Sequence, residues 1–221
     1  MSARAVVFDM DGVLVEGRGT DTWINRAAAA AALGTFGVDP DERLLDALES
    51  SVFTADMSAI CRDYGVETEA FWAARESAAS SIEHDRLRSG ERKPYEDVEV
   101  LFELASDRPL GIVSNNRHET VSFVVEQFGF GEVVGAYRGR HPTLADLRRR
   151  KPHPHFLEGV LDSLGTTDGI YVGDRRSDVL VAHNAGLEAA YLRREHNRDR
   201  PLPRGTTYEL DSLQDLLEIV D

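Results

Sequence analysis

Short apolar runs alternate with longer amphipathic stretches from residue 95 onward, and this alternation limits the possible folds more than any other feature of the chain. The runs predict strands at 109–113, 132–137, 169–172 and 187–192. The stretches between and after them predict helices at 95–106, 117–128, 153–164, 174–185 and 211–220. A further β-branched run predicts a first strand at 4–8. Strands that alternate with helices over short links indicate an α/β fold, here a doubly wound, mostly parallel sheet covered on both faces.

The segment at 16–90 has a different character, because it is rich in helix signals and poor in strand-like runs. It predicts four helices, at 21–33, 39–48, 55–64 and 68–87, with glycines following as stop signals. We therefore expect two domains. Residues 1–15 and 91–221 form a Rossmann-like core, and residues 16–90 form an all-helical domain inserted after the first strand.

Polar side chains follow three of the predicted strands, at the edge of the sheet where open α/β folds bind ligands. The first strand leads into Asp9 and Asp11, and a later one into Asp174 and Asp178. The remaining candidates are Ser114, Asn115, Asn116 and Lys151. Either asparagine contacts a ligand or caps the helix that begins near 117, and for Asn115 we expect the contact.

Four carboxylates in one crevice repel one another and raise each other's pKa, and a hard divalent cation removes that penalty. An oxygen-only ligand set without cysteine suits Mg²⁺ rather than Zn²⁺. The other groups match a phosphate, because Ser114 offers a hydroxyl at a helix start and Lys151 offers a positive charge. A phosphoryl group held there would lie against Asp9, whose carboxylate is able to attack phosphorus.

Four motifs in this order resemble the haloacid dehalogenase superfamily, in particular its phosphatase branch with a helical cap after the first motif. They are VFDMDGVL at 7–14, IVSNN at 112–116, KPHP at 151–154 and GDRRSD at 173–178. The resemblance covers essentially the whole chain and is greatest to phosphoglycolate phosphatase-like enzymes. It implies a phosphomonoester hydrolase that uses Mg²⁺ and an aspartyl-phosphate intermediate on a small phosphorylated metabolite. A phosphotransferase of the sugar phosphomutase kind shares all four motifs and remains the alternative.

The resemblance also implies a role for each matching residue. Asp9 would be the nucleophile, and Asp11 would be the general acid and then the general base. Ser114 and Lys151 would bind the transferring phosphoryl group. The implied Mg²⁺ ligands are Asp9, the backbone carbonyl of Asp11, Asp174, and Asp178 either directly or through water. The helical domain would be a mobile cap that excludes water.

Charge and composition exclude several classes of protein. The net charge of −14 argues against binding to nucleic acid. The one cysteine, Cys61, excludes a disulfide-rich secreted fold, and no apolar run approaches the ~20 residues of a membrane span. We expect a cytoplasmic enzyme without membrane contact or an obligate protein partner.

The basic residues are mostly arginine, because only Lys93 and Lys151 are lysines. An acidic chain with so few lysines resembles proteins of salt-loving organisms, while a GC-rich genome would explain the arginines but not the excess of carboxylates. We expect Arg148, Arg149 and Arg150 to be a solvated helix end. Arg18 lies in the predicted hinge, where it is either solvated or able to meet an anionic part of a substrate.

Overall fold

The computed structural model describes residues 4–17, 20–49, 53 and 55–219, and its centre is one six-stranded sheet. All neighbouring strands are parallel, in the order β3-β2-β1-β4-β5-β6. The strands are β1 (Ala5–Phe8), β2 (Leu110–Arg117), β3 (Val134–Arg140), β4 (Gly169–Gly173), β5 (Glu188–Leu192) and β6 (Tyr208–Leu210). The predicted doubly wound α/β fold is therefore confirmed.

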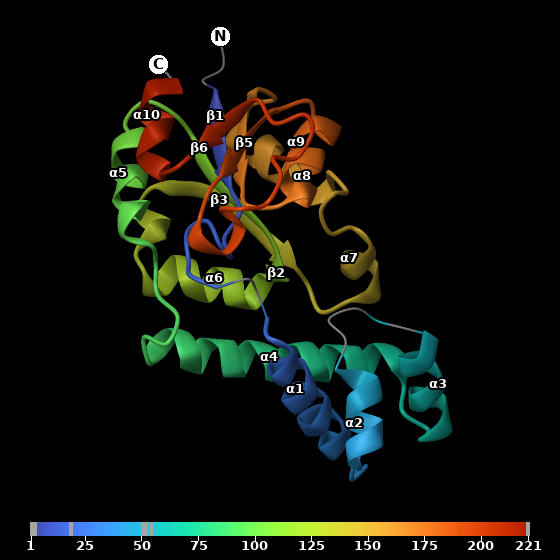
Figure 1. Cartoon of the computed structure of the whole chain (residues 1–221). Helices are drawn as coiled ribbons and strands as arrows, with labels where there is room; N and C mark the ends of the chain where they lie inside the picture. Colours follow the sequence, from blue (N-terminus) through green and yellow to red (C-terminus); the bar gives the residue numbers. More distant parts are fainter. Residues whose placement is uncertain (1–3, 18–19, 50–52, 54, 220–221) are drawn as a thin grey trace.

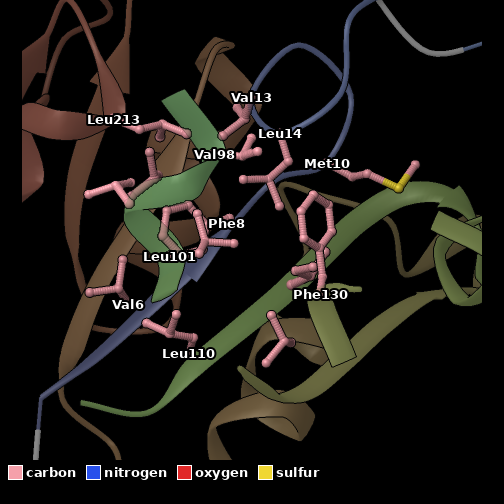
Figure 2. Packing of buried hydrophobic residues seen from close by; sticks show 14 of the residues in the cluster. Val6, Phe8, Met10, Val13, Leu14, Val98, Leu101, Leu110, Phe130 and Leu213 are labelled. Atoms are coloured by element: carbon pink, nitrogen blue, oxygen red, sulfur yellow. The ribbon is translucent and has the colours of Figure 1, made fainter. Parts of the chain in front are cut away.

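Helices cover both faces of the sheet, and the side chains of β1 show why. Val6 and Phe8 point into one apolar cluster, while Ala5 and Val7 point into the other. The first cluster, part of which is drawn in Figure 2, contains residues of α5 (Val100–Leu104), α6 (His118–Gln127) and α10 (Leu216–Ile219) and packs them against the sheet. The second packs it against α8 (His155–Leu164) and α9 (Arg176–Asn184). Since β1 is buried on both faces, its sequence is apolar at every position.

Four helices lie between β1 and β2 in the sequence: α1 (Thr22–Thr35), α2 (Glu42–Leu48), α3 (Ala55–Asp63) and α4 (Thr68–Arg88). Figure 1 shows them together on one side of the sheet, with α4 lying lengthwise beneath α6, and α4 contacts α6. They share an apolar cluster that includes Leu33, Leu48, Cys61, Phe71 and Trp72, and Leu147, which follows β3 in the chain, also belongs to it. The long helix α4 begins after Glu67, whose carboxylate accepts hydrogen bonds from the N–H groups of Glu69 and Ala70.

Several boundaries differ from the prediction. The predicted helices at 95–106 and 211–220 each begin as a 3₁₀ turn, at Glu96–Glu99 and Leu213–Asp215, before α5 and α10. The strand β6 has three residues and was not predicted. A short helix, α7 (Leu144–Arg148), follows β3. Within the described ranges, no helix is both long and apolar enough to cross a membrane.

The position of β1 brings the candidate residues together. The strand lies between β2 and β4, where the winding of the chain changes direction. Its carboxyl end therefore adjoins the carboxyl ends of β2 and β4, which is where ligands bind in open α/β sheets.

Candidate active site

Asp9 and Asp11 follow β1 directly and are both buried, with 5% and 6% of their surface exposed. The backbone N–H of Met10 donates to Asp9 Oδ1 over 2.8 Å. Gly12 has a φ of +84°, and a Cβ there would lie 2.5 Å from Asp174 Oδ2. Glycine at this position therefore permits the turn that brings the end of β1 against the end of β4.

Lys151 is the buried cation of the site. Its Nζ lies 2.9 Å from Asp9 Oδ1 and 2.8 Å from Asp178 Oδ1, and it donates a hydrogen bond to Tyr171 Oη over 2.8 Å. Burial alone would lower the pKa of Lys151, but Asp178 and Asp9 outweigh it and hold this pKa well above its usual value. The ammonium group is therefore charged at neutral pH.

Three carboxylates meet beside this lysine. Asp9, Asp174 and Asp178 are all buried, and each offers an oxygen within 4.8 Å of the others. Burial, with Asp178 and Asp11 nearby, raises the pKa of Asp9 to about 6 although Lys151 opposes the shift. Burial also raises the pKa of Asp178. Two cations face these three carboxylates, because Arg175 Nε also lies 3.6 Å from Asp174 Oδ1. One negative charge is therefore in excess.

A divalent cation fits this cluster. Asp174 Oδ1 is buried and has no hydrogen-bond partner among the residues that the structure describes. The three side chains offer only oxygen, the donor that Mg²⁺ prefers. Sequence reasoning missed one neighbour of the cluster, since His196 Nε2 lies 2.5 Å from Asp174 Oδ2.

The carboxylate of Asp11 points away from this cluster. Its Oδ1 accepts from Arg92 Nη2 over 2.6 Å, and its Oδ2 accepts from Asn116 Nδ2 over 2.8 Å. Arg92 also donates to Glu83 of α4 over 2.7 Å. The side chain of Asn116 thus orients Asp11, and Arg92 links Asp11 to the inserted helices.

Ser114 and Asn115 lie at the carboxyl-end part of β2. The hydroxyl of Ser114, which is buried, accepts from the Asn116 N–H over 3.1 Å. The side-chain amide of Asn115 holds the backbone of Lys151: its Oδ1 accepts from the Lys151 N–H over 2.7 Å, and its Nδ2 donates to the Lys151 carbonyl over 3.2 Å. Asn115 does not cap α6, and its expected contact with phosphate stays a prediction.

One cavity of about 220 Å³ is lined by part of this set, whereas Asp174 lines a neighbouring cavity and Asp178 lines neither. The predicted residues that line it are Asp9, Asp11, Ser114, Asn115 and Lys151. The candidate Asn116 also lines it, together with Thr20, Arg140, Arg150, Arg175 and Ser177. The expectation for Arg150 as part of a solvated helix end was therefore wrong, whereas Arg148 and Arg149 are exposed. Arg18 lies outside the described residues.

Comparison with known proteins identifies the family. The family model described as haloacid dehalogenase-like hydrolase matches residues 3–186. The chain belongs to this hydrolase family. The resemblance drawn from the four motifs is thus confirmed, and so is the prediction of an enzyme from this family.

Relatives within the haloacid dehalogenase-like family carry phosphatase names. The chain is 26% identical to phosphoglycolate phosphatase 1 of Pseudomonas aeruginosa, covering 99% of this chain and 80% of that protein. It is also 26% identical to the phosphoglycolate phosphatase of Pectobacterium atrosepticum, covering 98% and 92%. Of the solved structures, CbbY from Rhodobacter sphaeroides in complex with phosphate gives a TM-score of 0.66 at 18% identity, over 97% of this chain and 96% of that one. The last comparison shows the shared fold.

Proposed function

We propose that this protein is a Mg²⁺-dependent phosphomonoester hydrolase that acts on a small, phosphoglycolate-like metabolite through an aspartyl-phosphate on Asp9. The observation that carries the proposal is the pairing of Asp9 with Lys151 in a cavity that Ser114 also lines. The names of the relatives support the same activity. We expect the enzyme to work in the cytoplasm without an obligate partner.

In the first step, a carboxylate oxygen of Asp9 attacks phosphorus and the bond to the ester oxygen breaks. The electron pair stays on the departing oxygen, which takes a proton from Asp11. Lys151 and Ser114 bind the phosphoryl oxygens and stabilise the charge that develops on them. In the second step, water attacks the phosphorus of the aspartyl-phosphate, Asp11 accepts its proton, and Asp9 and inorganic phosphate are released.

Asp9, Asp174, Asp178 and the backbone carbonyl of Asp11 are the groups that would hold Mg²⁺. When bound, this ion supplies positive charge that neutralises the carboxylates and the phosphoryl group. The inserted segment 16–90 would act as a cap over the cavity. Thr20 on this segment lines the cavity, and Arg92 joins Asp11 to Glu83 of α4.

The substitution Asp9→Asn tests the proposal, because an amide cannot form the acyl phosphate. We expect kcat for hydrolysis of phosphoglycolate with Mg²⁺ to fall by at least about 10³-fold, and we expect EDTA to abolish the activity of the unchanged protein. Asp162→Asn, on the exposed face of α8, is the control and should keep full activity. Activity retained in Asp9→Asn would contradict the role of Asp9.

The same preparations separate hydrolysis from the alternative reaction. A phosphotransferase of the sugar phosphomutase kind would isomerise a hexose 1-phosphate faster than it releases inorganic phosphate. We expect phosphate release to be the faster reaction, and a chromatographic assay of both products measures the ratio.

A further inference from the structure

Arg150 differs from every other cation of the active-site cavity in its partners. It is half-buried and lines the cavity directly before Lys151 in the sequence. Lys151 is paired with two carboxylates, and Arg140 pairs with Glu76 and donates to the Asn115 carbonyl. The guanidinium of Arg150 has no ion pair or hydrogen bond with any residue in the described part of the chain.

Two features of the surroundings destabilise the charged guanidinium of Arg150, which has no partner among the described residues to offset them. Burial and the nearby charge of Arg140 lower the pKa of Arg150, so both effects disfavour its charged form. The chain has 39 acidic residues against 25 basic ones, yet none of the described acids pairs with this guanidinium. A half-buried guanidinium that shares the cavity with a second guanidinium is stabilised by an anion that enters it.

The backbone holds Arg150 in this position. The Asn115 amide binds both the N–H and the carbonyl of Lys151, and the Arg150 carbonyl accepts from the His153 N–H over 3.0 Å. The turn that presents the Lys151 ammonium to Asp9 therefore also fixes the residue before it. Arg148 and Arg149, on the same segment, stay outside the cavity.

We propose that Arg150 binds a second anionic group of the substrate, so that the enzyme selects small phosphomonoesters that carry a carboxylate. The inference rests on the proposed function, because it assumes that the phosphoryl group lies between Asp9, Ser114 and Lys151. The cavity of about 220 Å³ has room for a phosphoryl group with a short acid beside it. The planar guanidinium binds a carboxylate through two parallel hydrogen bonds, and such charged hydrogen bonds are the strong ones.

Binding of two phosphonates tests the inference without turnover. Phosphonopropionate is phosphoglycolate with a methylene group in place of the ester oxygen, and propylphosphonate has the same shape with a methyl group in place of the carboxylate. By calorimetry with Mg²⁺, we expect the unchanged protein to bind phosphonopropionate about 10- to 100-fold more tightly. Arg150→Met should bring this ratio close to one.

Matched variants separate recognition by Arg150 from a general effect of charge. Arg148→Met removes an equal charge from the same segment, and we expect it to leave the ratio unchanged. Arg150→Lys keeps the charge but not the paired hydrogen bonds, so it should keep part of the preference. This variant also serves if Arg150→Met does not fold. In turnover, Arg150→Met should raise KM for phosphoglycolate at least tenfold more than KM for ethyl phosphate.

Several outcomes would overturn the inference: equal binding of the two phosphonates, binding of neither by the unchanged protein, or a ratio that Arg150→Met leaves intact. Failure of the proposed function looks different. In that case Asp9→Asn keeps its activity, whereas the binding ratio and its dependence on Arg150 are unaffected.

Discussion

Tyr171 connects the sheet to the catalytic lysine and shows how single residues of β4 support the site. Its hydroxyl is buried, accepts from Lys151 Nζ, and donates to the carbonyl of Val113 over 2.6 Å. Burial raises the pKa of Tyr171 well above its usual value although Lys151 opposes the shift. The phenol therefore stays neutral and joins β2, β4 and Lys151.

We predict that Tyr171→Phe lowers the free energy of unfolding by about 1–3 kcal/mol, because Lys151 and Val113 each lose a buried hydrogen bond. Urea unfolding followed by circular dichroism measures the change. Tyr64→Phe removes a hydroxyl from an exposed tyrosine and should change the stability by less than about 0.5 kcal/mol. Equal effects of the two substitutions would mean that the hydroxyl of Tyr171 contributes nothing.

At this scale, the sequence predicted the groups that follow strand ends and missed those that reach the site through tertiary contacts. Asp9, Ser114 and Asp174 follow from one rule about where parallel strands end. Arg92 and Tyr171 do not, since Arg92 contacts Asp11 across 81 positions and Tyr171 contacts Val113 across 58. No local pattern encodes such separations.

Among the elements, the turn between β4 and α9 depends on a missing side chain. A Cβ at Gly173 would lie 2.1 Å from the Cβ of Asp178. Asp178 Oδ2 accepts from the N–H groups of Asp174 and Arg175, over 3.2 and 2.9 Å, and so closes the first turn of α9. Gly173 therefore permits the close approach on which the position of Asp178 depends.

We predict that Gly173→Ala lowers the free energy of unfolding by about 3 kcal/mol through overpacking. We also expect it to weaken Mg²⁺ binding, because Asp178 has to move. Gly159→Ala on α8 is the control: a Cβ there meets nothing within 4 Å, and the helix should gain about 0.5–1 kcal/mol. Thermal unfolding with and without Mg²⁺ measures both. Similar effects of the two substitutions would contradict the steric argument.

The helix α4 is joined to the core by a buried carboxylate, Glu76, which pairs with Arg75, Arg117 and Arg140. Burial alone would raise the pKa of Glu76, but the three guanidinium groups outweigh it and hold this pKa below its usual value. The stabilisation is therefore present above the ordinary glutamate pKa and is lost as the pH falls through the lowered value in the folded protein.

We predict that Glu76→Gln lowers the free energy of unfolding at pH 7 by about 3–5 kcal/mol, because three buried cations lose their common partner. The difference from the unchanged protein should shrink as the pH falls below the ordinary glutamate pKa. Urea unfolding over a series of pH values measures it. Glu126→Gln, exposed on α6, should show neither effect. A difference that stays constant with pH would contradict the ionised pairing.

Most elements could be predicted because their apolar period is local. The strand β6 was missed because three residues are too few to show alternation. Its extended conformation depends on its pairing with β5, which is a tertiary contact. The strand β2 was predicted to end at 113, but it continues through polar residues to Arg117. Those residues are held there by site contacts, such as those of Asn115 with Lys151 and of Asn116 with Asp11.

For the whole molecule, the dominant physical property is the net charge of −14. We predict that the melting temperature at pH 7 rises by several degrees between about 0.1 M and 2 M KCl, since salt screens the repulsion between carboxylates. Differential scanning calorimetry measures the shift. Near pH 4.9, where the net charge vanishes, the dependence on salt should be much weaker. A melting temperature that does not respond to salt at pH 7 would argue against a halophilic protein.

The place of β1 in the sheet also bears on how the chain is made. The strand that leads to Asp9 is synthesised well before its partners β2 and β4, which begin only at Leu110 and Gly169. At typical rates of translation, Ala5 precedes Leu110 by about 5–20 s. During that interval neither β2 nor β4, the two strands that pair with it in the sheet, is available to it. The inserted helices, which supply most of one apolar cluster, are complete before either neighbour of β1 exists.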